Sequence, residues 1–299
     1  MAIIHLGILF LITFFGCNMS THPSDTKLQG YDLSQPDKKL ELPDTLREIS
    51  GLASLDANSC ACIQDENGIL FIYDMVKNEI RAQHDFGVDG DYEGIAQVGE
   101  ALYIMRSDAV LFEIKDYTTG KLKVTTYETN APAEDCEGLC YDKDHHRLLI
   151  GVKGKAGKHK EDKDQRLVFG FDLQSKTLLA EPVFNFSVET IRRYAEVNNI
   201  ELPTKIKKDG ETGKPILKFK TSDLAIHPIT KKLYLLSADD YLLLVFDMDG
   251  KIENMVQLNP DLFNKPEGIT FSDNGDLFVS NEAQGKKATI LKFKYQNIK

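Results

Sequence analysis

A short motif recurs five times along this chain, and its spacing limits the possible folds more than any other feature. The motif is usually an acidic residue and a glycine followed by an apolar residue and a small one; the first copy has Ser in the acidic place, and the fourth has Ser-Asp in place of Glu-Gly. Its copies begin at Ser50, Glu93, Glu137, Ser222 and Glu267. Successive copies are 43, 44, 85 and 45 residues apart. A period in the forties is typical of β-propellers, in which each blade is a sheet of four antiparallel strands.

Each repeat divides into short apolar strands separated by turn residues. In the second repeat, strands are predicted at 94–98, 101–106, 110–115 and 121–128. Asn67-Gly68 and Asp249-Gly250 fall where tight hairpins require positive φ. The pattern predicts an all-β fold.

The 85-residue interval is close to two periods and raises the alternative of a six-bladed ring. Its residues favour five blades. The third repeat's own strands extend to about Phe186, and Ser187 resembles a helix N-cap, with Val188, Ile191 and Ala195 on one helical face. We therefore predict a five-bladed β-propeller with a short helical insertion around 187–216. The fifth repeat lacks a fourth strand, and residues 39–42 are expected to supply it and close the ring.

The N-terminal segment is predicted to be a leader rather than part of the fold. Residues 2–16 are apolar, too short for a comfortable membrane span, and end at Cys17. This resembles the lipobox of bacterial lipoproteins, although no Lys or Arg precedes the apolar run and Phe14 replaces the usual Leu. An ordinary cleaved signal and an uncleaved anchor are the alternatives. The expected organisation is a signal peptide over 1–17, cleaved before Cys17, a polar tether over 18–38 and one propeller domain over 39–299.

Export determines how the charge and the cysteines are interpreted. The lipobox places the protein in the bacterial cell envelope, lipid-anchored at the outer membrane or the periplasmic face, and we expect a monomer. The formal charge of −10 argues against nucleic-acid binding, which needs a basic face. Disulfides are permitted outside the cytosol. Buried free thiols are nevertheless favoured over a cross-strand disulfide for Cys60, Cys62, Cys136 and Cys140.

Three segments around the repeated motif carry a family resemblance. They are 46–52 (LREISGL), 91–95 (DYEGI) and 265–269 (KPEGI). They resemble the SdiA-regulated (YjiK-like) family over roughly residues 40–296, and more distantly the chain is similar to NHL-repeat and phytase-like propellers. The resemblance implies a five-bladed propeller with a calcium site and no established biochemical activity.

Acidic residues are expected to collect at one mouth of the ring. The first strand of a blade lines the channel and the second runs antiparallel to it, so the start of the first and the end of the second lie at the same mouth. Carboxylates packed together raise one another's pKa, and a divalent cation would relieve this. Oxygen ligands without His or Cys favour calcium over zinc. The alternative is that these residues are hydrogen-bonded strand caps or are solvated at the rim.

The candidate residues form four groups. The candidate calcium ligands are Glu93, Glu137, Asp223, Glu267 and Asn281. The further residues expected to line the mouth are Glu48, Asp65, Asp108, Asp239 and Glu282. Arg106 and Lys153 are candidate contacts for an anion, and Cys17 is the candidate lipidation site. A near match to an EF-hand loop at 89–100 is interpreted as coincidental, because no amphipathic helix flanks it.

Two functions are considered beside a purely structural scaffold, in which the mouth carboxylates would be dispensable. The first is a calcium-binding module of the cell envelope that binds a small molecule or a protein at the propeller mouth. Its support is the predicted anchor, the acidic mouth and the lack of a recognisable nucleophile with a base. The alternative is a calcium-dependent hydrolase of a phosphoester or a lactone, in which the metal polarises the substrate and a carboxylate acts as general base.

Overall fold

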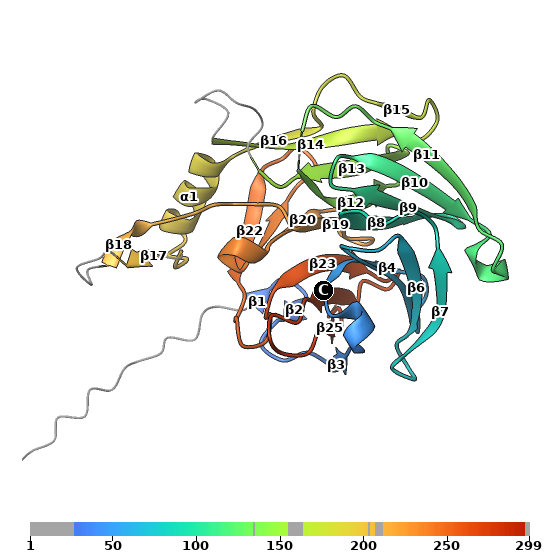
Figure 1. Ribbon diagram of the computed structural model, residues 1–299. Helices are drawn as coiled ribbons and strands as arrows, with labels where there is room; N and C mark the ends of the chain where they lie inside the picture. The colour runs from blue at the N-terminus through green and yellow to red at the C-terminus, as the bar shows by residue number, and fades with distance from the viewer. Residues whose placement is uncertain (1–26, 134, 155–163, 203, 207–211, 297–299) are drawn as a thin grey trace, which may run out of the picture.

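The protein is a five-bladed β-propeller, as its repeats predict. The computed structural model describes residues 27–296 apart from 134, 155–163, 203 and 207–211. Five antiparallel sheets surround a central axis, and the first strand of each sheet lies innermost (Figure 1). The predicted leader, including Cys17, lies outside the described residues. Among the residues that are described, no helix is long and apolar enough to cross a membrane.

In the first four blades the strands follow chain order from the centre outward, and in blade 3 β14 also pairs with β16. Blade 1 holds β4 (Ile49–Ser54), β5 (Ser59–Gln64), β6 (Ile69–Asp74) and β7 (Glu79–Asp85). Blade 2 holds β8 (Tyr92–Val98), β9 (Ala101–Arg106), β10 (Val110–Lys115) and β11 (Lys123–Glu128). Blade 3 holds β12 (Cys136–Asp142), β13 (Arg147–Val152), β14 (Gln165–Asp172), β15 (Thr177–Leu178) and β16 (Phe184–Ser187). Blade 4 holds β19 (Asp223–Ile226), β20 (Leu233–Ser237), β21 (Leu242–Phe246) and β22 (Ile252–Gln257).

The fifth blade is completed from the other end of the chain. Its first three strands are β23 (Pro266–Phe271), β24 (Leu277–Asn281) and β25 (Thr289–Phe293), and its outer strand is β3 (Lys38–Glu41). Leu40 lies opposite Ile290 in the antiparallel register of β3 and β25, and both side chains are buried. This confirms the predicted closing strand at 39–42.

The long interval between the third and fourth repeats holds the predicted insertion. Helix α1 (Val188–Val197) begins at Ser187, whose side chain accepts a hydrogen bond from the Thr190 amide at 3.2 Å. Its buried face is Val188, Ile191 and Ala195, as expected from the sequence. A two-stranded ribbon, β17 (Thr204–Ile206) with β18 (Thr212–Pro215), follows. The described residues of the interval therefore supply no sixth blade.

The motif glycines allow the inner strands to approach one another. A Cβ atom on Gly94 would lie 2.8 Å from the Leu139 Cβ on the next blade, and one on Gly138 would lie 2.8 Å from the Asp223 Cα. A Cβ on Gly268 would lie 2.9 Å from the Leu52 side chain, on the first blade. Real side chains avoid such distances, so ring packing requires glycine at these three positions.

The four cysteines of the described chain are free and buried. The Sγ atoms of Cys60 and Cys62 are 3.6 Å apart on one face of β5. This agrees with the expectation of buried free thiols.

The described chain enters the ring through a small docked hairpin. Strands β1 (Lys27–Leu28) and β2 (Tyr31–Asp32) pair, and Leu28, Tyr31 and Leu33 are buried against blades 4 and 5. Part of the tether predicted over 18–38 is therefore packed on the ring. Its apolar side chains, Leu28, Tyr31 and Leu33, are buried against hydrophobic residues of blades 4 and 5.

A buried histidine holds this hairpin. The Nδ1 atom of His227 accepts hydrogen bonds from the amides of Ile229 and Thr230, so its Nε2 carries the proton and donates to the Tyr31 hydroxyl at 2.7 Å. The Tyr31 hydroxyl in turn donates to the Gly275 carbonyl oxygen. Because His227 follows the inner strand β19 and Gly275 precedes β24, the hairpin lies at the end of the ring opposite the predicted acidic mouth.

Candidate functional site

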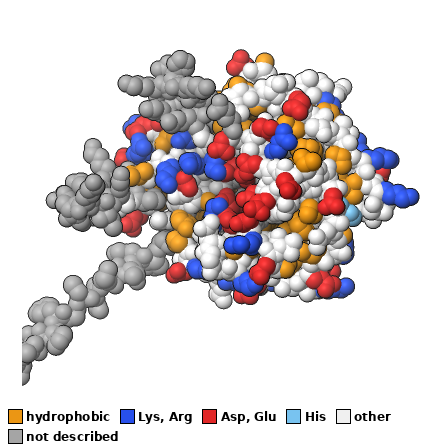
Figure 2. All heavy atoms as spheres, in the orientation of Figure 1, with side chains coloured by type: hydrophobic (Ala, Val, Ile, Leu, Met, Phe, Trp, Pro, Cys, Tyr) orange, Lys and Arg blue, Asp and Glu red, His pale blue; other side chains and the backbone are white. Residues whose placement is uncertain are grey.

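A pocket of about 180 Å³ occupies the mouth of the ring where the inner strands begin. Carboxylates and lysines from all five blades surround it, and Figure 2 shows acidic side chains gathered near the centre of this face with basic ones beside them. The charged lining residues are Glu48, Asp65, Glu93, Glu137, Asp239, Glu267, Glu282, Lys153, Lys220 and Lys265. We call this the mouth pocket.

A β-bulge directs the motif carboxylates toward the pocket. The pairing of β8 with β9 skips Glu93, and that of β23 with β24 skips Glu267. The pairing of β12 with β13 shifts across Glu137 and Gly138, and Gly138 has φ of +90°. A bulge re-aims a side chain out of the regular alternation of a strand. The repeated Glu-Gly is thus both a packing device and a means of placing carboxylates at the mouth.

The lysines neutralise part of this acidic charge. The Lys153 ammonium forms an ion pair with Glu137, and the Lys265 ammonium contacts Glu282 and, at 3.0 Å, Glu267. Lys220 lies 3.2 Å from the Asp239 carboxylate. Seven carboxylates and three ammonium groups leave the lining with an excess of negative charge.

The side of the pocket formed by blades 2 and 3 holds two glutamates with raised pKa values. Burial, the Glu137 charge and a hydrogen bond with Asp91 raise the pKa of Glu93 to about 10. Burial raises the pKa of Glu137 to about 8, although the Lys153 contact opposes this. The same pairing raises the pKa of Lys153 despite its burial. Glu93 is therefore neutral at pH 7.

The side formed by blades 1 and 5 holds the least compensated carboxylate. Burial and the neighbouring Glu48, Glu282 and Glu66 charges raise the pKa of Asp65 to about 6. The Oδ1 atom of Asp65 is buried and has no hydrogen-bond partner among the described residues. Neither Asp65 nor Glu48 forms an ion pair within the described chain.

Asp223, a candidate calcium ligand, has a structural position instead of lining the pocket. It stands where the other repeats have glycine, and it is buried in the channel. Its Oδ1 accepts hydrogen bonds from the amides of Leu224 at 2.8 Å and Leu139 at 3.3 Å, and its Oδ2 from Ile269 at 2.7 Å. The side chain therefore connects the inner strands of blades 3, 4 and 5. Burial nevertheless raises the pKa of Asp223 well above its usual range.

Three other candidates also lie away from the pocket lining. Asp108 pairs with Arg106, with Nη2 and Oδ2 separated by 2.7 Å, so the candidate anion contact Arg106 is engaged at the rim. Asn281 is buried and donates to the Thr289 hydroxyl at 3.1 Å, while its Oδ1 has no partner among the described residues. Of the two anion-contact candidates, Lys153 lines the mouth pocket and Arg106 does not.

The sequence prediction missed the other two lysines of the lining. Lys265 and Lys220 each stand two residues before the acidic position of their repeats, where blades 1, 2 and 3 have Glu48, Asp91 and Asp135. The repeat therefore has a second charged position, acidic in three blades and basic in two. Aligning the five repeats two residues further toward the N-terminus would have revealed it.

The carboxylate oxygens at the mouth are the kind of ligand that a hard cation prefers, but they are not arranged around a common point. Within the described residues, no group of three or more His, Cys, Asp and Glu side chains is arranged to hold a metal ion. The lysine ammonium groups lie between the carboxylates, where a cation would reduce their repulsion. Metal binding would require these ion pairs to rearrange.

Comparisons with known proteins agree with the fold. The structure of Myxococcus xanthus glutaminyl cyclase is similar, with a TM-score of 0.57 and 12% identity over 89% of this chain and 97% of that one. A streptogramin B lyase structure has a TM-score of 0.47 and 12% identity, over 87% of this chain and 97% of that one. No curated protein matches the sequence. At 12% identity, the likeness to the glutaminyl cyclase shows the fold alone.

The sequence comparison with protein families identifies one family. The family model described as SdiA-regulated matches residues 185–284, which include the insertion, the whole of blade 4 and the inner strands of blade 5. The matched segment contains Lys220, Asp239, Lys265, Glu267 and Glu282 of the mouth pocket. This is the family that the repeated motifs resemble, and its model matches residues 185–284 of this five-bladed β-propeller, about a third of the chain.

Proposed function

We propose that the mouth pocket binds a cationic ligand. The observation that carries this proposal is the crowding of carboxylates around Asp65. Its pKa is raised to about 6 by burial and by neighbouring acidic groups, and one of its oxygens is buried without a partner in the described chain. A bound positive charge would stabilise the ionised carboxylates, and the pocket has room for a small molecule.

Calcium and an organic ammonium group share the required chemistry. Calcium takes six to eight oxygen ligands, so Glu48, Asp65 and neighbouring carboxylates would have to come together around it. An ammonium group needs only a few hydrogen bonds to carboxylates, as Lys265 already makes in this pocket. In both cases the chain contributes the same residues and holds them on rigid strand ends.

Calorimetric titration with calcium chloride and, separately, with ethanolamine tests this proposal. We expect one or both to bind, and the melting temperature to rise with ligand concentration. Asp65→Asn and Glu48→Gln should weaken binding at least tenfold. Glu79→Gln is the matched control, because Glu79 is an exposed glutamate on the outer strand of blade 1. If neither cation binds, or if the Asp65 and Glu48 variants bind like the wild type, the proposal is wrong.

A hydrolytic activity is the second candidate, and the raised pKa of Glu93 favours it. A carboxyl group that keeps its proton at neutral pH can act as a general acid, and Glu93 lines the same pocket as Lys153. A panel of phosphoesters and lactones, assayed with and without calcium, would reveal turnover. An activity that survives Glu93→Gln unchanged would argue against this role.

We also propose that the protein is exported and attached to the cell envelope through a lipid on Cys17. The support within the described residues is the position of the hairpin, which brings the chain to the ring at the end opposite the mouth pocket. Attachment on that side leaves the mouth accessible. Metabolic labelling with a fatty-acid analogue should label the wild type, and Cys17→Ser should abolish labelling and release the protein from membranes. Unchanged labelling in that variant would refute it.

A further inference from the structure

A second pocket adjoins the mouth pocket and has the opposite charge. Its volume is about 550 Å³, and its lining includes Arg166, Arg192, Lys218 and Lys220, with Asp164 as the acidic member. Lys220 lines both pockets. In Figure 2 basic side chains lie directly beside the central acidic cluster.

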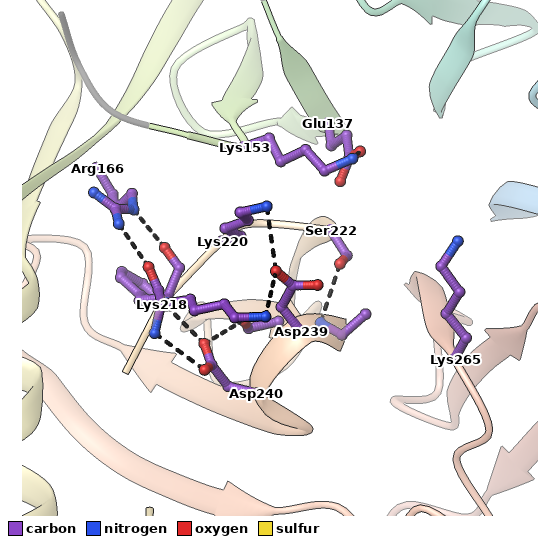
Figure 3. A network of polar contacts seen from close by, with 12 residues as sticks. Glu137, Lys153, Arg166, Lys218, Lys220, Ser222, Asp239, Asp240 and Lys265 are labelled. Atoms are coloured by element: carbon purple, nitrogen blue, oxygen red, sulfur yellow. Dashed lines mark hydrogen bonds and ion pairs between the residues drawn. The ribbon is translucent and has the colours of Figure 1, made fainter. Parts of the chain in front are cut away.

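Two lysines share a single carboxylate at the border between the pockets. The Nζ atoms of Lys218 and Lys220 lie 3.3 Å and 3.2 Å from the same Oδ2 atom of Asp239 (Figure 3). These contacts lower the pKa of Asp239, although its partial burial opposes this. One carboxylate cannot neutralise two ammonium groups, so the border carries an excess positive charge.

The backbone that presents these lysines is clamped from both sides. The buried Arg166 guanidinium donates to the carbonyl oxygens of Lys218 and Phe219, as Figure 3 shows. The Asp240 carboxylate accepts from the Lys218 amide at 3.1 Å and from the Phe219 amide. Both edges of this dipeptide are therefore held by charged side chains.

The clamp maintains an unfavourable backbone conformation. Phe219 is fully buried and has φ of +41°, which is uncommon for a residue with a Cβ atom. Such conformations persist only where the surrounding structure enforces them, and they are concentrated at functional sites. Here Lys218 and Lys220, on either side of Phe219, reach the same Asp239 oxygen.

We propose that Lys218 and Lys220 form an anion subsite for a phosphate or carboxylate group. A wider consequence is that one ligand carries both an anionic and a cationic group. This consequence rests on the proposed cation site, whereas the anion subsite itself does not. The anionic group would displace Asp239 as the partner of the two ammonium groups, and the cationic group would lie among the mouth carboxylates. Arg166 is a positioning residue, because its Nε and Nη2 atoms donate to the carbonyl oxygens of Phe219 and Lys218.

Titration with inorganic phosphate, ethanolamine and O-phosphoethanolamine tests both parts of the inference. We expect phosphate to bind, and O-phosphoethanolamine to bind at least tenfold more tightly than either half, because the second contact becomes intramolecular. The Lys218→Met/Lys220→Met double variant should abolish phosphate binding and should not weaken ethanolamine binding, because Lys220 also lines the mouth pocket and the loss of its positive charge favours a bound cation there. Lys218→Arg/Lys220→Arg should retain phosphate binding. Asp239→Asn should strengthen it by removing the competing carboxylate.

Lys123→Met is the control and should bind phosphate like the wild type. Lys123 is an exposed lysine on the outer strand of blade 2, and it also pairs with a carboxylate, that of Asp116. The anion subsite is refuted if phosphate does not bind, or if it binds equally well to the double methionine variant. If phosphate binds through the two lysines but ethanolamine and calcium do not bind, the anion subsite stands and the proposed cation site fails. If phosphate and ethanolamine each bind but O-phosphoethanolamine binds no more tightly than either, the two sites do not bind one ligand together.

Discussion

At the scale of single residues, burial decides what an acidic side chain of the repeat can do. Glu93 and Asp223 both stand at the start of an inner strand, and the sequence identifies both only as carboxylates. Glu93 lies in a bulge beside Glu137 and keeps its proton, whereas Asp223 accepts hydrogen bonds from backbone amides. Their expected responses to substitution therefore differ.

Glu93 is expected to make stability depend on pH. Its pKa in the folded protein, about 10, lies above the ordinary glutamate value, so its contribution is fully present below about pH 4.5 and is lost as the pH rises toward 10. Glu93→Gln resembles the protonated form, so this variant should be more stable than the wild type at pH 9 and similar at pH 5. Urea unfolding at both pH values measures this. Equal pH dependence in the two proteins would contradict the buried, protonated state.

Asp223 is expected to contribute to ring stability through its three backbone hydrogen bonds. Asp223→Ala would leave the amides of Leu139, Leu224 and Ile269 without this acceptor, and each buried unpaired group costs about 1–3 kcal/mol. We expect a loss of about 3 kcal/mol or more in the free energy of unfolding, measured by chemical denaturation. Asp273→Ala, at an exposed position in blade 5, is the control. A loss below about 0.5 kcal/mol would show that the hydrogen bonds to Asp223 are dispensable.

At the scale of the elements, the Glu-Gly dipeptide connects packing to function. Its glycine permits close contact between adjacent inner strands, and its glutamate occupies the bulge that faces the mouth. Lys218 and Lys220 are presented differently, by a segment clamped between Arg166 and Asp240. The side chains of the mouth thus come from the first residues of the inner strands and from the segments before them, where the backbone does not follow the regular hydrogen-bond pairing of a sheet.

Gly94→Ala tests the packing part of this argument. The new Cβ would lie 2.8 Å from the Leu139 Cβ and 3.0 Å from the Leu139 amide nitrogen, and backbone cannot move away as a flexible side chain can. We expect a destabilisation of about 1–3 kcal/mol, as is usual for overpacked sites. Gly154→Ala is the control, since its Cβ would meet no atom within 4 Å. Two variants of equal stability would mean that the inner strands can separate without cost.

At the scale of the whole molecule, segments from near both ends of the described chain meet in one blade. Strand β3 completes the sheet of β23, β24 and β25, and the β1–β2 hairpin covers the adjoining surface of blades 4 and 5. Closure of this kind joins the first and last blades through backbone hydrogen bonds. Stability of the ring should therefore depend on a segment that precedes the first repeat.

Truncation separates the contributions of the hairpin and the closing strand. A chain that starts at residue 27 retains both and should melt within a few degrees of the full chain. A chain that starts at residue 38 loses the buried Leu28, Tyr31 and Leu33 and should melt lower, and one that starts at 43 also loses β3 and should not unfold cooperatively. Circular dichroism melting compares the three. Cooperative unfolding of the shortest chain at the full-length temperature would contradict closure by β3.

Local patterns in the sequence predicted five blades, with six as the alternative, the closing strand and the N-cap of α1. These depend on local patterns, namely the period of the motif, the alternation of strands and turns, and a capping serine. It also predicted an acidic mouth, and seven carboxylates do line the pocket there. Such placement follows from blade topology, because equivalent positions in each repeat meet at one end of the ring.

Only the tertiary structure decided which charged groups pair. Asp223 binds backbone amides of three blades, Arg106 is engaged by Asp108, and Lys265 lies between Glu267 and Glu282. The docking of Tyr31 on His227 joins residues 196 positions apart. Pairings of this kind depend on distances and burial between segments remote in the chain, and no local pattern encodes those. The sequence therefore predicts that acidic residues gather at the mouth, whereas their protonation and pairing depend on burial and distances in the folded ring.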